Sequence, residues 1–101
     1  MTSERIPLAS LTSAELDADT LAALFSDLAE LTQVDEVLIK GAPGTYAGVA
    51  GLTEAARQLA SGARGVQIRY VWQTQAWCDT LIQGPAGVRL VRNRIESEPQ
   101  R

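Results

Sequence analysis

Residues 66–94 read VQIRYVWQTQAWCDTLIQGPAGVRLVRNR, and this stretch decides the fold. Apolar and aromatic residues occupy every second position from Val66 to Trp72, and this period of two, with its β-branched and aromatic content, is typical of a strand. Gly84-Pro85-Ala86-Gly87 is a turn sequence between two further apolar stretches. The sequence therefore predicts a three-stranded antiparallel meander.

The positions of the two turns set the register of this meander. If Thr74 and Gln75 form the tip of the first hairpin, Trp72 lies opposite Trp77. Closing the second hairpin at residues 84–87 sets the register of the third strand. The cross-strand neighbours of both hairpins then lie on the same face of the sheet. The predicted cross-strand neighbours are Trp72 with Trp77, Tyr70 with Asp79, Ile68 with Leu81, Leu81 with Leu90, Asp79 with Arg92 and Trp77 with Arg94.

One face of the meander changes character along its length. Its apolar end consists of Val66, Ile68, Leu81 and Leu90. The other end is aromatic and charged, and we predict that it is a binding surface. It consists of Tyr70, Trp72, Trp77, Asp79, Arg92 and Arg94. We expect this face to meet the helices because its apolar residues are larger, whereas the opposite face carries Arg69 and Arg89. The alternative for Asp79 and Arg92 is a structural ion pair at the rim of the sheet.

The amino-terminal third predicts a helix. Thr12 and Glu15 have the spacing of a capping box, which places the helix start near Ser13. Asp19 offers an alternative cap, with a main helix over residues 20–32. An apolar stripe at three- and four-residue spacing supports helical structure in either case. It consists of Leu21, Leu24, Phe25, Leu28 and Leu31.

The middle of the chain predicts a strand, a loop and a second helix. Residues 34–40 are rich in β-branched and apolar side chains, and the glycine-rich segment 41–51 follows them. Its spacing fits neither common phosphate-binding motif, so it serves best as a connection, and whether it binds a ligand stays open. Thr53 is placed to cap a helix over residues 54–61.

These elements predict an α+β fold in the order α-β-α-β-β-β, in which two helices pack on a small, mostly antiparallel sheet. We divide the chain into a flexible arm at 1–10, one domain at 11–94 and a flexible tail at 95–101. The pattern leaves open where the strand at 34–40 joins the sheet. The closing strand, Gly-Val-Arg-Leu-Val-Arg at 87–92, resembles the last hairpin of NTF2-like domains over about a quarter of the chain, and no function is transferred from it.

Composition excludes several kinds of chemistry. The 101 residues include no histidine, one cysteine and one lysine, Lys40. A Ser-His-Asp or Cys-His arrangement is therefore impossible, and paired zinc ligands are absent. Cys78 lacks a histidine base, which favours a structural cysteine over a nucleophile. The sequence thus leans against an enzyme and predicts no cofactor and no metal.

Net charge and targeting signals limit the kinds of partner and the cell compartment that the sequence predicts. The net charge is −3, with acids concentrated in the first half and arginines in the second, which argues against a general attraction to nucleic acid or anionic lipid. The sequence contains no visible secretory signal and no stretch long enough to span a membrane, so we expect a cytoplasmic protein.

By exclusion, the sequence predicts a non-catalytic accessory or adaptor protein. It would bind another protein through the aromatic and arginine end of its carboxy-terminal sheet. The alternative is a single-stranded nucleic-acid or small-ligand binding module that uses the same face. A homo-oligomer formed through an edge strand stays open as well.

Overall fold

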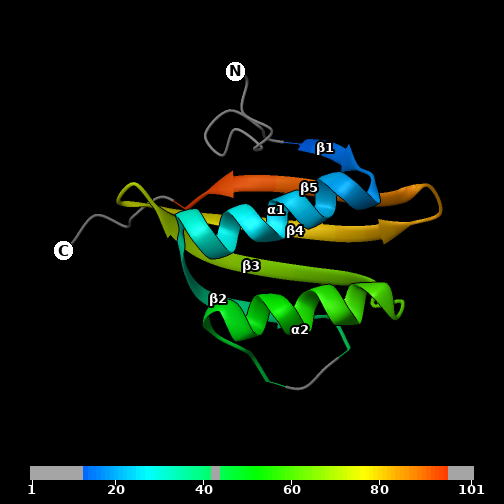
Figure 1. Ribbon diagram of the computed structural model, residues 1–101, viewed down its shortest axis with the longest axis horizontal. Coiled ribbons are helices and arrows are strands. Elements are labelled where there is room, and N and C mark those ends of the chain that lie inside the picture. Colours follow the sequence, from blue (N-terminus) through cyan, green and yellow to red (C-terminus); the bar gives the residue numbers. More distant parts are fainter. Residues whose placement is uncertain (1–12, 42–43, 96–101) are drawn as a thin grey trace.

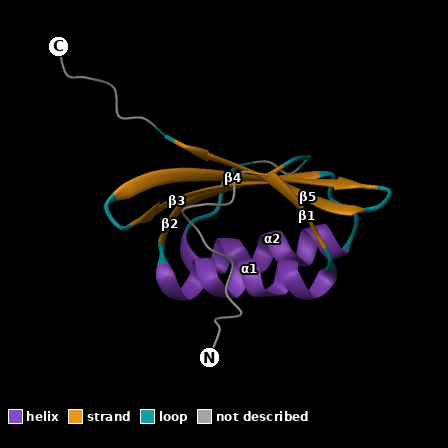
Figure 2. Ribbon diagram, turned by 90° about the horizontal axis from the view of Figure 1, so that it is seen from above, coloured by secondary structure: helices purple, strands orange, loops and turns teal. Residues whose placement is uncertain are grey.

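The computed structural model describes residues 13–41 and 44–95, which form a five-stranded sheet with two helices (Figure 1). All neighbouring strands are antiparallel, and the order across the sheet is β1-β5-β4-β3-β2. Both helices lie on the same face of the sheet (Figure 2). In chain order the elements are β1 (Ser13–Leu16), α1 (Ala18–Leu31), β2 (Gln33–Ile39), α2 (Gly48–Ala60), β3 (Gly65–Trp72), β4 (Gln75–Gly84) and β5 (Gly87–Arg94).

The predicted α+β class and the carboxy-terminal meander are confirmed, and the sheet gains a strand that the sequence did not predict. Residues 1–12, which include the predicted arm and Thr12, lie outside the described residues, as do 42–43 and 96–101. The strand at 34–40 is β2, and it joins the sheet at the edge beside β3.

The predicted helix start near Ser13 is wrong. Ser13–Leu16 forms β1, and Ser13 pairs with Val91. Pairing with a distant strand overrides the local capping signal, because the segment satisfies its backbone groups in the sheet and buries Leu16. Helix α1 begins after Asp17, whose carboxylate accepts a 2.8 Å hydrogen bond from the backbone N–H of Thr20.

The second helix begins earlier than predicted. Thr53 is not a cap but lies inside α2, where its hydroxyl bonds to the carbonyl of Val49. The chain is held before the helix by Tyr46, which forms an antiparallel bridge with Val37 of β2. Gly51 lies against this bridge, and a Cβ there would be 3.0 Å from the side chains of both Tyr46 and Val37. Gly51, which the sequence placed in a loop, is therefore a residue of α2 at which the helix packs closely against Tyr46 and Val37.

The first hairpin is shifted by two residues from its predicted register. Its tip is Gln73 and Thr74, so Tyr70, and not Trp72, lies opposite Trp77. Both tip residues have positive φ, 52° and 63°, which defines a type I′ turn without glycine or asparagine. Because the shift is even, every side chain keeps its predicted face. In the second hairpin the predicted register is confirmed, with Asp79 opposite Arg92.

This turn provides a stability test. We expect Gln73→Asn combined with Thr74→Gly to raise the free energy of unfolding by about 1 kcal/mol, because the new residues tolerate the left-handed region that a β-branched threonine resists. Urea denaturation measures the change. Thr74→Ala keeps a Cβ at the strained position and serves as the control; an equal gain in this control would contradict the explanation.

The predicted buried face of the meander is confirmed. Val66, Ile68, Leu81 and Leu90 lie between the sheet and the helices and are at most 2% exposed. From the helix side the core is completed by Leu24 and Leu28 of α1 and by Leu52, Ala55 and Leu59 of α2. Within the described ranges, neither helix is long and apolar enough to cross a membrane.

Candidate functional site

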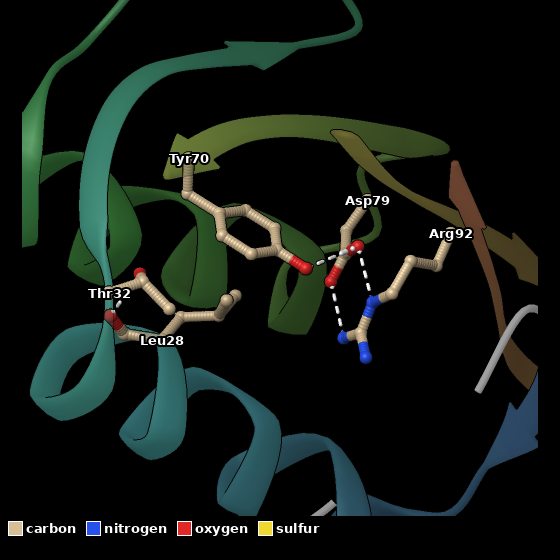
Figure 3. Close-up of polar contacts among 5 residues, drawn as sticks. All are labelled: Leu28, Thr32, Tyr70, Asp79 and Arg92. Atoms are coloured by element: carbon tan, nitrogen blue, oxygen red, sulfur yellow. Dashed lines mark hydrogen bonds and ion pairs between the residues drawn. The ribbon is translucent and has the colours of Figure 1, made fainter. Parts of the chain in front are cut away.

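Three polar side chains form a hydrogen-bonded network beneath the helices, one from each strand of the meander (Figure 3). Asp79 of β4 accepts two hydrogen bonds from Arg92 of β5: from Nε to Oδ1 and from Nη2 to Oδ2, both at 2.7 Å. The hydroxyl of Tyr70 of β3 donates to Oδ1 of the same carboxylate at 3.0 Å. The side chains of Asp79 and Arg92 are fully buried.

Burial and charge act together on this network. Burial raises the pKa of Tyr70, and the charge of Asp79 raises it further. Burial alone would lower the pKa of Arg92, but the hydrogen bonds and charge of Asp79 outweigh it, and the net shift is upward. The phenol therefore stays neutral and the guanidinium stays charged, so the arrangement is a bidentate ion pair with one additional donor. Breaking such a pair is costly because an uncompensated charge is left in the interior.

The remaining predicted site residues form the row beyond this network. Trp77 lies opposite Tyr70 on one side and Arg94 on the other. Trp72 is two pairs nearer the turn, opposite Gln75. Both indoles are half-buried and pack against the core, whereas Arg94 is exposed. We call Trp72, Trp77 and Arg94 the tryptophan end.

The structure thus divides the six predicted residues into two groups. Tyr70, Asp79 and Arg92 are enclosed, and Asp79 and Arg92 do not lie at the rim of the sheet where the structural alternative placed them. The tryptophan end lies beside them on the same sheet face and reaches the surface. Within the described part of the chain, the indole Nε1 of Trp77 is buried and has no hydrogen-bond partner.

Hydrogen bonds hold the carboxy-terminal end of β5, the strand that carries Arg94. The backbone N–H of Ile95 donates to the carbonyl of Ala76 at 2.9 Å, and Nε2 of Gln75 donates to the carbonyl of Ile95 at 3.0 Å. Ile95, which was predicted to begin the flexible tail, is therefore bonded to β4. These bonds hold the backbone on which the tryptophan end is built.

Cys78 is buried on the opposite face of the sheet. Burial raises the pKa of its thiol and outweighs the opposing charge of Arg69. Because the thiolate is the reactive form, we expect native protein at pH 8 to react with iodoacetamide several-fold more slowly than glutathione. Mass spectrometry follows the alkylation. In urea the difference should disappear, and fast alkylation of the native protein would contradict the assignment.

One feature of the helix side was not predicted from the sequence. An apolar groove lies between α1 and α2 at the β4–β5 turn, at the other end of the sheet from the tryptophan end. The small residues Ala18, Ala22, Ala56 and Ala60 are consistent with a groove, but the apolar stripe in the sequence does not give the spacing of the two helices. No group of three or more metal-ligating side chains occurs among residues 13–41 and 44–95.

Comparison of the chain with family models, curated proteins and solved structures finds no match. The resemblance of the closing strand to NTF2-like domains therefore carries no family assignment. The class defined by the observed architecture is an α+β domain with two helices on one face of a five-stranded antiparallel sheet.

Proposed function

We propose that this protein is a non-catalytic accessory module that binds another protein through the tryptophan end. The observation that carries the proposal is that two half-buried tryptophans and an exposed arginine lie beside a fully buried ion pair on the same face of the sheet. Tryptophan and arginine are the residue types that most often dominate protein interfaces. Tyr70, Asp79 and Arg92 act as its support and do not contact the partner.

The rigidity of the buried Tyr70–Asp79–Arg92 network favours binding of a partner by the tryptophan end. A contact surface that is already ordered loses less conformational entropy on binding. The bidentate bonds of Arg92, the bonds of Ile95 and the packing of both indoles against the core restrict the surface before a partner arrives.

A protein partner is favoured over nucleic acid by charge. The chain carries a net charge of −3, and single-stranded nucleic acid requires a positively charged groove beside its stacking platforms. The cytoplasm is the compartment that we propose for this interaction.

Affinity capture from an extract of the source cells tests the proposal. We expect Trp72→Ala and Arg94→Ala to lose a partner that the wild-type protein retains. Ile82→Ala and Arg89→Ala alter exposed residues on the opposite face and should retain that partner. Circular dichroism spectra of all four variants exclude unfolding as the cause of a loss.

The chemical nature of the partner decides between the two classes. Binding to a protein should survive nuclease treatment and change little between low and moderate salt, whereas binding to nucleic acid should weaken steeply. Retention of every captured partner by both tryptophan-end variants would contradict the proposal, as would a partner that nuclease removes.

A further inference from the structure

The groove between the helices has a cavity volume of about 580 Å³, which lies in the range typical of small-molecule sites. Its walls are formed by Leu21 and Phe25 of α1 and by Leu59 of α2, and Leu16 and Val88 also line it. It is open to solvent along one side. The space exists because the facing helix positions are small: Ala18 and Ala22 in α1, and Ala56 and Ala60 in α2.

The two polar side chains that line this groove, Asp17 and Gln83, each offer a hydrogen-bond acceptor. Asp17 lies at its edge, and the backbone and side-chain hydrogen bonds from Thr20 lower the pKa of its carboxyl, so it is ionised at neutral pH. Gln83 uses Nε2 to donate to the carbonyls of Leu59 and Ala63, at 3.1 and 2.9 Å. This leaves the side-chain oxygen of Gln83 as its remaining polar group.

Among the described residues that line the groove, the charged side chain is negative. Helix α2 ends at Ala60, so its carboxy-terminal end, which carries partial negative charge, borders the groove. The amino-terminal end of α1 also borders it, but Asp17 and Asp19 lie at that end and oppose its positive charge. No lysine or arginine is among the described residues that line the groove. The site therefore suits a positive charge or an N–H donor and disfavours an anion.

We propose that the groove binds a small amphiphile with an apolar body and an ammonium head group, the head lying at Asp17 and the body between Leu21, Phe25 and Leu59. This site is separate from the tryptophan end, and the proposal does not depend on the proposed function. The neutral and anionic analogues of the same chain length provide a direct test of the charge argument.

Titration of the full chain with dodecylammonium, dodecanol and dodecanoate, each below its micelle concentration, tests the proposal. Isothermal titration calorimetry gives the affinities, and ¹H–¹⁵N spectra locate the binding. We expect dodecylammonium to bind most tightly and dodecanoate least, with the largest shifts at residues of α1 and α2 that line the groove. Equal binding of the cation and the anion would overturn the proposal.

Two variants separate the charge from the shape. Asp17→Asn keeps the helix cap, since asparagine caps as well as aspartate, and should weaken dodecylammonium about twofold to fivefold without affecting dodecanol. Ala60→Phe fills the groove from an exposed position and should weaken both ligands about tenfold or more, because two or more methylenes lose their contacts. Asp35→Asn and Ser26→Phe make the same changes elsewhere and should leave both affinities unchanged.

Other occupants of the groove give different results. If no probe binds but Ala60→Phe changes the oligomeric state or abolishes capture of a protein partner, the groove is a protein contact and the proposal is wrong. If probes bind but the spectra place them on the opposite sheet face, it is wrong as well. In either case the experiment on the tryptophan end stands, because its variants lie at the other end of the sheet.

Discussion

Replacing Asp79 with asparagine is expected to lower the free energy of unfolding by about 3–5 kcal/mol. The substitution preserves size and removes the charge that both Nε and Nη2 of Arg92 contact in a fully buried position. A loss of this size is comparable to the total stability of many small domains. Urea denaturation, followed by tryptophan fluorescence and circular dichroism, measures it.

The matched control removes the whole network. The triple variant Tyr70→Phe, Asp79→Leu, Arg92→Met leaves neither an unpaired charge nor the phenol hydroxyl, so we expect it to lose less stability than Asp79→Asn alone. If the single variant costs under about 1 kcal/mol, the support beside the tryptophan end is weaker than the geometry implies. The proposed function would then lose its argument from rigidity.

Leu28→Ala is expected to lower the free energy of unfolding by about 2–5 kcal/mol. Leu28 is completely buried between α1 and the sheet, so truncation leaves a cavity. The 2.7 Å bond from the hydroxyl of Thr32 to the carbonyl of Leu28 uses the backbone and is kept (Figure 3). The same denaturation experiment measures the effect.

Leu31 provides the comparison within the same helix. It is 44% exposed, and Leu31→Ala is expected to change the free energy of unfolding by about 0.5 kcal/mol or less. The apolar stripe predicted both leucines as one face. Similar losses for the two variants would mean that α1 packs with a different face from the one observed.

Periodicity predicted the meander well because the side-chain period of a strand is robust to errors in turn position. The tip was placed one residue too late, at Thr74 and Gln75; this shifts the pairing register by two residues, so no side chain moved to the other face. The unusual turn explains the error, since Gln73 and Thr74 both adopt a conformation that their residue types disfavour. Nothing local distinguishes them from ordinary strand residues.

Long-range contacts account for what the sequence could not predict. Residues Ser13–Leu16 carry helix-start signals, but they pair with β5, a strand far along the chain. The ion pair of Asp79 and Arg92 followed from the second register, whereas its burial depended on how far the helices extend over the sheet. The groove depends on the spacing of the two helices, which no periodicity encodes.

Strand β1 pairs only with β5 within the described sheet, so the first strand in the chain has its partner in the last. Contacts between such distant segments form slowly, because the entropy cost of closing a long loop comes before any inter-strand hydrogen bond can offset it. Pairing of β1, and with it burial of Leu16, therefore requires that β5 already has its place beside β4.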